Sequence, residues 1–379
     1  MHVPRPDLKH LWCRALCSCD AGRLVQQRFA GILDDTEPVH VLALGKAAGP
    51  MAAGAISLLE GRAKTSLVIS STREGAPDMA KVCVGEHPHP GPGSFAAGRE
   101  LLARAEEIQR RGEKALVLVS GGGSALCEVP APGLTENDLR AAHEALVSSG
   151  APIETINRLR RKLSAIKGGG LARALGPSLA WEGVLVDIPS CDPDAVASGP
   201  CSREGEAGAG RFVVGTPVTL AEAAASAARE SESIPVVVRS EVVSGMTVEQ
   251  LGEEVLRHLS TGSGLWIASG EVSVPLPRGG PKGHGGRAQH LALWVLHAAR
   301  HRLGEGRWAF LAAGSDGRDG TGGAGALVDD DIKGCDRLTR EALEEHASGE
   351  AHRKYGSLIE EHPPRTNLTD LYIAWAPDD

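Results

Sequence analysis

Short apolar runs alternate with amphipathic segments along most of the 379-residue chain. The runs end in glycine-rich turns, and the segments between them have the spacing of helices. In the first half, strands are predicted at 39–44, 65–70, 115–119 and 184–187, and helices at 6–30, 47–59, 94–111 and 135–148. Strands that alternate with helices are typical of a mostly parallel sheet covered on both faces.

The same pattern resumes after 201–211, where glycines among charges favour a linker. Strands are predicted at 212–214, 234–238, 265–269, 308–312 and 371–375, helices at 219–230, 248–259 and 287–301, and a turn at 328–331. A chain of this length usually has more than one core. We therefore expect an N-terminal α/β domain at 1–210 and a C-terminal α/β domain at 211–379. Each would be a mostly parallel, Rossmann-like sheet with helices on both faces, with a cleft between the two.

Composition narrows the classes of function. A net charge of −8 and an aromatic content of 3% argue against nucleic-acid partners. No apolar run approaches 18 residues and the N-terminus lacks an h-region, so we expect a cytoplasmic protein without a membrane partner. The eight cysteines are scattered. The group Cys13, Cys17 and Cys19 lacks paired zinc-type spacing, and buried free thiols are a better interpretation for it than a metal site or a disulfide.

Two glycine turns follow strands in the first half and are candidate anion sites. Gly45 and Lys46 precede a helix, where a cation and free backbone amides would both favour a phosphate or carboxylate. The second turn allows backbone amides to approach one anion, and it comprises Ser120, Gly121, Gly122, Gly123 and Ser124. A solvated surface lysine and a flexible linker are the structural alternatives.

Further candidates in the first half are basic and acidic. Asn157 and Arg160 belong to a basic stretch that could equally be an exposed helix. Asp187 ends a predicted strand and Asp192 lies on the loop after it. Carboxylates there suit Mg²⁺ or a hydroxyl proton, or they only cap turns.

The second half repeats the arrangement. Glu271 ends a strand, and a loop from 279 to 286, with Gly285 and Gly286 at its end, leads into Arg287 at a helix start. Arginine matches phosphate geometry, although a pair with a surface carboxylate is the alternative. Asp316 and Asp319 lie in a third glycine loop, which a plain surface turn would also explain.

Taken in order, these motifs resemble the MOFRL-type (class II) glycerate 2-kinases over most of the chain. The resemblance rests on 44–47, 120–126, 156–169, Asp192-Pro193 with 197–200, 270–274, 285–287, 316–320 and 366–370, which includes Asn367. It implies transfer of phosphate from ATP to the 2-hydroxyl of D-glycerate or a close hydroxy acid, with Mg²⁺, in a cleft between two α/β domains. The facing cations of the family correspond to Lys46 and Arg287. On this basis Lys46, Arg287, Asp187 and Asp192 are the expected catalytic residues, the two aspartates also being candidate metal ligands.

The chain departs from the family pattern at several positions. His284, Ala288 and His290 replace a basic residue, an asparagine and a glutamate, Ser190-Cys191 stands for glycine and aspartate, and Arg365 replaces a glycine. These changes motivate a second hypothesis, a diverged homologue that binds nucleotide or anion without turnover. A third, a hydroxypyruvate reductase, is disfavoured because no G-x-G-x-x-G follows a strand with an acidic residue about 20 positions on. The sequence leaves the exact acid and the oligomeric state open, a homodimer included.

Overall fold

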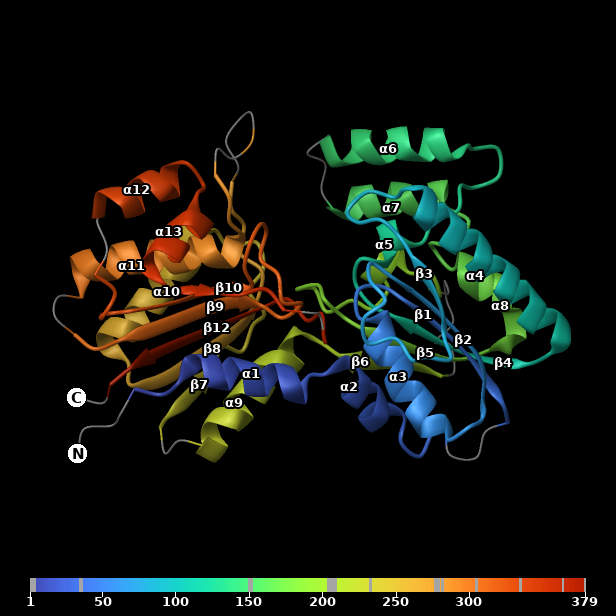
Figure 1. Cartoon of the computed structure of the whole chain (residues 1–379), viewed down its shortest axis with the longest axis horizontal. Helices are drawn as coiled ribbons and strands as arrows, with labels where there is room; N and C mark the ends of the chain where they lie inside the picture. The colour runs from blue at the N-terminus through green and yellow to red at the C-terminus, as the bar shows by residue number, and fades with distance from the viewer. Residues whose placement is uncertain are drawn as a thin grey trace. The chain divides into compact units, whose positions relative to one another are not determined.

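The computed structural model divides into two compact units, which Figure 1 labels by element. It describes residues 5–33, 37–148, 153–202, 210–231, 234–275, 280, 283–303, 306–333, 336–362 and 365–377. The first unit comprises 20–216 and 365–367, and the second comprises 1–19, 217–364 and 368–379. Each unit contains one six-stranded sheet.

The sheet of the first unit is entirely parallel, as predicted. Its strands are β1 (Val39–Leu44), β2 (Ala63–Ser70), β3 (Lys81–Val84), β4 (Lys114–Val119), β5 (Leu179–Leu185) and β6 (Arg211–Gly215). Their order is β3-β2-β1-β4-β5-β6, and Leu44 of β1 is level with Val119 of β4. In this doubly wound order the direction of winding reverses between β1 and β4, and ligands typically bind beyond the carboxyl ends of the strands at such a point.

Helices cover both faces of this sheet. Helices α4 (Pro92–Arg111) and α8 (Gly170–Leu175) pack on one face in a core that contains Leu42 and Leu44. All six residues of β1 are buried, so its other face is covered too, and α3 (Ala48–Leu59) and α2 (Ala21–Phe29) contact the sheet there. The remaining helices of this unit are α5 (Gly123–Leu126), α6 (Glu136–Ser148), α7 (Ile153–Leu163) and the short η1 (Gly176–Ser178) and η2 (Val196–Ser198).

The sheet of the second unit is mixed, so the expectation of a mostly parallel sheet is wrong here. Its strands are β7 (Val236–Val238), β8 (Gly264–Gly270), β9 (Ala309–Gly314), β10 (Gly325–Asp329), β11 (Leu358–Ile359) and β12 (Asp370–Ala376), in the order β11-β10-β9-β12-β8-β7. Among the strands that the structure describes in this unit, only β7 and β8 pair in parallel. The C-terminal strand β12 runs antiparallel between β8 and β9, and β10 returns beside β9 after a connection too short for a parallel crossover.

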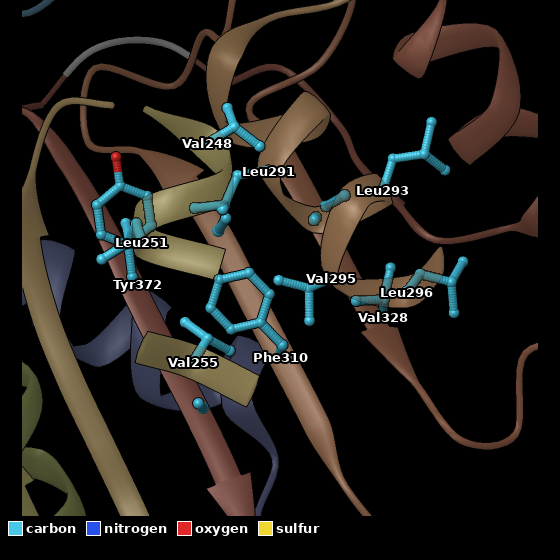
Figure 2. Close-up of a cluster of buried hydrophobic side chains, with 14 of the residues drawn as sticks. Val248, Leu251, Val255, Leu291, Leu293, Val295, Leu296, Phe310, Val328 and Tyr372 are labelled. Carbon is cyan, nitrogen blue, oxygen red and sulfur yellow. The ribbon is translucent and has the colours of Figure 1, made fainter. Parts of the chain in front are cut away.

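Two helical layers complete the α/β architecture of the second unit. Helices α10 (Val248–Thr261) and α11 (Arg287–Arg302) pack on the face that carries Phe310 and Tyr372, as Figure 2 shows. Helices α1 (Leu8–Ser18) and α9 (Pro217–Ser231) pack together and contact the sheet. The unit also contains α12 (Asp336–Glu344) and α13 (Ser348–Tyr355).

Three local predictions need correction. The single helix at 6–30 is two helices, because the carboxylate of Asp20 accepts hydrogen bonds from the amides of Gly22 and Arg23 and starts α2. The strand at 212–214 pairs with β5 in the first sheet, not within the second half. The turn at 328–331 is largely replaced by β10, whose Val328 pairs with Phe310 of β9.

The cysteines in the described part of the chain differ in their exposure. Cys13 and Cys17 are exposed, contrary to the expectation of buried thiols, while Cys19, Cys127 and Cys201 are buried and all five are free. Cys335 lies outside the described residues. No helix in the described part of the chain is long and apolar enough to cross a membrane.

Candidate functional site

The loops after β1 and β4 are tied together at the reversal point of the first sheet. The amide of Lys46 donates to the carbonyl of Gly121 (2.8 Å), and the amide of Ala47 donates to Oγ of Ser120 (3.1 Å). Gly45 has φ = 119° and a Cβ there would overlap Ser120, so the close approach of the two loops requires glycine. The two glycine turns predicted separately from the sequence therefore form one structure.

The side chain of Lys46 runs along the second turn. A Cβ placed on Gly122, whose φ is 82°, would lie 3.1 Å from Cγ of Lys46 and 3.4 Å from Cδ2 of His87. Lys46 is half-buried. Sequence reasoning missed His87, although its position in a histidine- and proline-rich stretch after β3 is a signal for an ordered turn.

A carboxylate and an amide lie against the same turn. Nδ2 of Asn367 donates to Oδ2 of Asp187 (2.9 Å). A Cβ on Gly121 would overlap Oδ2 of Asp187 and would lie 2.5 Å from Nδ2 of Asn367. Asn367 is 6% exposed and belongs to the first unit despite its place near the end of the chain. The structure thus brings together five predicted residues: Lys46, Gly121, Gly122, Asp187 and Asn367.

The last serine of the turn contacts the loop that follows β5. Oγ of Ser124 lies 2.8 Å from Oγ of Ser198, and a Cβ on Gly123 would be 2.8 Å from Cβ of Ala197. Asp192, on the same loop, is exposed, and its Oδ1 accepts a hydrogen bond from the amide of Asp194 (2.9 Å). This contact is the turn-capping role that was the structural alternative for Asp192.

The basic stretch 157–167 is partly internal. Asn157 and Arg160 are half-buried on α7, and burial lowers the pKa of Arg160 although the charge of Glu128 opposes that shift. Lys167 forms a buried ion pair with Glu128, which also accepts from Oγ of Ser164 (2.5 Å). This ion pair was not predicted, because a buried lysine cannot be told from an exposed one by sequence pattern.

In the second unit Arg287 joins two carboxylates. Its Nε donates to Oδ2 of Asp370 (2.7 Å) and its Nη2 to Oε1 of Glu271 (2.6 Å). Burial lowers the pKa of Arg287, but Asp370 and Glu271 outweigh burial, so the pKa is raised and the guanidinium stays charged. The hydroxyl of Tyr372 also donates to Asp370 (3.2 Å). Asp370 and Tyr372 were not predicted as site residues.

The start of α11 is already occupied by a carboxylate. Asp319 accepts hydrogen bonds from the amides of Ala288 (3.2 Å) and Gln289 (2.7 Å), and a Cβ on Gly286 would overlap it. Burial, reinforced by the charge of Asp370, raises the pKa of Asp319 to about 7. Asp319 therefore caps the N-terminus of α11, beside Gly286 and Arg287, which were predicted to bind phosphate.

Gly285 and Asp316, two other predicted residues of the second unit, also form hydrogen bonds with loop residues. The amide of Gly285 donates to Oγ1 of Thr321 (2.9 Å), and Oδ1 of Asp316 accepts from the amide of Arg318 (3.1 Å). Of the predicted loop 279–286, residues 279 and 281–282 lie outside the described residues.

Comparisons with known proteins assign the chain to a family. Residues 7–228 match the model described as domain of unknown function DUF4147, and residues 264–370 match the MOFRL family. The chain belongs to the DUF4147 family. The pairing of these two matches supports the resemblance stated above.

The relatives of this DUF4147 protein carry two kinds of name. It is 28% identical to D-glycerate 2-kinase of Thermotoga maritima over 88% of this chain and 90% of the relative. It is 29% identical to a protein of Agrobacterium vitis that is named provisionally as a hydroxypyruvate reductase, over 87% and 85% of the two chains. The crystal structure of glycerate kinase from Thermotoga maritima matches with a TM-score of 0.84 and 25% identity, covering 97% of this chain and 98% of that chain.

The positions that depart from the family pattern have local contacts in this DUF4147 protein. Nδ1 of His284 pairs with Oε1 of Glu350 (2.8 Å). Ala288 is fully buried, and His290 stacks on His346, with a pKa that burial lowers to about 4. Cys191 has φ = 53°, and the carbonyl of Arg365 accepts from the amide of Ala21 (2.9 Å).

Proposed function

We propose that this protein is an ATP-dependent kinase that phosphorylates the 2-hydroxyl of D-glycerate or a close hydroxy acid to give 2-phosphoglycerate or its analogue. The names of several relatives support the reaction class. The observation that carries the proposal for this chain is the convergence of Lys46, the turn 120–124 and the Asp187–Asn367 pair at the reversal point of a parallel sheet.

The residues of the first unit suit the needs of phosphoryl transfer, which depends on positioning and charge neutralisation. Lys46 would bind the carboxylate of the acid or a phosphate, and backbone amides of 121–124 would bind the same anion, since the amide of Ser120 donates to the carbonyl of Leu44 (2.9 Å). Asp187, oriented by Asn367, would accept the proton of the 2-hydroxyl. The hydroxyl oxygen then attacks the γ-phosphorus of ATP, and the bond between that phosphorus and the ADP oxygen breaks.

Magnesium suits the oxygen donors of Asp187 and Asp192, because hard cations prefer carboxylates. Bound there, Mg²⁺ would neutralise charge on the phosphates of ATP. Asp187 is half-buried and hydrogen-bonded, which fixes its carboxylate, whereas Asp192 is exposed at a turn. Asp187 is therefore the stronger candidate of the two.

Arg287 is proposed to stabilise the charge that develops on the transferred phosphoryl group. Its Nε and Nη2 already contact Asp370 and Glu271, whose two negative charges exceed its one positive charge. We infer that a phosphate could bind Arg287 only if a cation offsets these carboxylates or if Glu271, which is more exposed than Asp370, moves away. If that cation is Mg²⁺, activity should depend on Mg²⁺ more strongly than it would if Lys46 alone supplied the positive charge for the phosphate.

Two alternatives remain to be tested against the kinase. Relatives named for hydroxypyruvate reductase favour a second candidate reaction, reduction of hydroxypyruvate by a nicotinamide cofactor. The turn after β1, with Lys46 in place of a G-x-G-x-x-G sequence, favours the kinase instead. The altered positions 191, 284, 288 and 290 keep the binder without turnover as the other alternative, and a metabolite kinase would fit the cytoplasmic location expected from the sequence.

Product analysis separates the three candidate functions: the kinase, the reductase and the binder without turnover. The full chain is incubated with ATP, Mg²⁺ and a panel of hydroxy acids, and products are followed by phosphorus NMR. A new phosphomonoester that forms only with a 2-hydroxy acid, together with ADP, supports the kinase. Oxidation of NADH or NADPH by hydroxypyruvate without ADP formation would support the reductase. Thermal stabilisation by ATP without any product would identify the binder.

A further inference from the structure

His297, His301 and Asp336 form a compact group in the second unit. Oδ1 of Asp336 lies 2.9 Å from Nδ1 of His297 and 3.0 Å from Nε2 of His301. The three ligand atoms all lie within 4.8 Å of one another. His297 and His301 follow Arg287 by ten and fourteen positions on α11, roughly 15 and 21 Å along the helix, so the group is separate from the residues around Arg287.

Two packed helices hold the group in place. The histidines are four residues apart and share one face of α11, with ring centroids 4.8 Å apart. Asp336 is the first residue of α12, a helix fixed by the buried residues Thr339 and Ala342. Nη2 of Arg340 donates to Oδ2 of Asp336 (2.8 Å), which leaves Oδ1 directed at the two imidazoles.

One atom in the group is not satisfied by hydrogen bonds. Nδ1 of His297 is buried and has no hydrogen-bond partner within the described residues, although Oδ1 of Asp336 is only 2.9 Å away. The separation is short, but the direction does not suit an N–H···O bond. A buried polar atom without a partner costs free energy, and a cation placed between the two atoms would engage both.

We propose that His297, His301 and Asp336 bind one divalent transition-metal ion of the Zn²⁺ class, with water completing the shell. Two histidines one turn apart and a carboxylate are a typical donor set for such ions. Tetrahedral Zn²⁺, with bonds of about 2.0–2.2 Å, needs ligand atoms about 3.3 Å apart. The two short separations would therefore open by a few tenths of an ångström, and the two histidine nitrogens, within 4.8 Å of each other, would approach by up to about 1.5 Å. A hard ion such as Mg²⁺ would bind poorly here, because it prefers oxygen donors to imidazole nitrogens.

One further charged side chain lies beside the group. Arg340 brings a positive charge to the carboxylate of Asp336 and would limit the affinity. The bound ion would connect α12 to α11 and stabilise the second unit.

Metal titration of the full chain tests the site. Untagged protein is first treated with a chelator, and then Zn²⁺ binding is measured by calorimetry and Co²⁺ binding by visible absorption. We expect one saturable ion per chain, tetrahedral Co²⁺ bands, and a melting temperature that rises with Zn²⁺ concentration. His297→Ala, His301→Ala and Asp336→Asn should each weaken binding at least about tenfold.

His284→Ala is the matched control, because His284 pairs with Glu350 at 2.8 Å and the part of the chain that the structure describes places no second histidine ligand beside this pair. This variant should bind Zn²⁺ like the wild type. Melting curves without metal show whether each variant folds, and only folded variants are compared. Failure of the wild type to bind one ion, or unchanged binding in folded His297→Ala and His301→Ala proteins, would overturn the proposal.

Discussion

Asp187 and Asn367 form the pair on which the proposed proton transfer depends. Asn367 donates to Oδ2 of Asp187 at 2.9 Å, and the backbone of Gly121 prevents either side chain from moving toward the turn. A hydrogen bond to a carboxylate favours its charged form and fixes its direction. Asn367 is therefore a positioning residue for Asp187.

Replacing Asn367 by alanine should lower kcat by up to about 100-fold, because misplacement of a reacting group by about 1 Å is that costly. Steady-state kinetics at saturating substrate measure this fall in kcat. Asn137→Ala, at an exposed position on α6, is the control, and a kcat of Asn367→Ala equal to that of the control would contradict the role.

Asp319 should make the stability of the protein depend on pH. Its folded pKa is raised to about 7, above the ordinary value of 3.8, so the folded protein binds this proton more tightly than the unfolded chain does. Its stabilising contribution is complete below about pH 4 and is lost as the pH rises through 7. Urea unfolding from pH 4.5 to 8 should show this fall in the free energy of unfolding, and Asp319→Asn should make it shallower. An unchanged slope in the variant would count against the assignment.

At the scale of elements, the turn between β4 and α5 determines whether the site can form. Gly121 has the carboxylate of Asp187 and the amide of Asn367 against it, and Gly45 has Ser120 against it. Neither position has room for a side chain. The two loops and the residues after β5 therefore depend on one another.

Gly121→Ala should abolish most of the activity, because its Cβ would displace Asp187 and Asn367 from the positions that they now occupy. A fall in kcat/KM of about 100-fold is expected from such a displacement. The control is Gly306→Ala, an exposed position where the nearest atom to a new Cβ, the carbonyl oxygen of Leu303, is 3.8 Å away. Equal activity of the two variants would show that the turn tolerates rearrangement.

Apolar periodicity located most elements of the first sheet, and glycine turns located the loops between β1 and α3 and between β4 and α5. Apolar periodicity did not find the break at Asp20, because the apolar spacing continues through both α1 and α2 while a side-chain cap separates them. It missed the role of β10 because glycines and aspartates at its ends suggest a turn, whereas pairing with β9 makes it a strand.

At the scale of the whole molecule, each unit is built from segments that are not consecutive along the chain. Residues 1–19 and 368–379 belong to the second unit, while 365–367 belong to the first. Local sequence cannot reveal these assignments, because they depend on contacts between segments hundreds of residues apart. The antiparallel position of β12 between β8 and β9 is of the same kind.

The rate of the whole reaction should depend on the charge of Lys46. Lys46 supplies the cation at the reversal point of the first sheet, and loss of such a charge-stabilising group typically costs about 10²–10³ in rate. Lys81 is a suitable comparison, because it is a lysine of the same unit whose exposed pair with Glu100 contributes little to stability.

The most direct test is the rate of ADP formation from ATP and D-glycerate, with Mg²⁺, for wild type, Lys46→Ala and Lys81→Ala proteins of equal melting temperature. We expect glycerate-dependent ADP formation by wild type and Lys81→Ala, and a rate about 10²–10³ lower for Lys46→Ala. Glycerate-dependent ADP formation that Lys46→Ala retains at the wild-type rate, or no ADP formation by the wild type with any 2-hydroxy acid, would contradict the account.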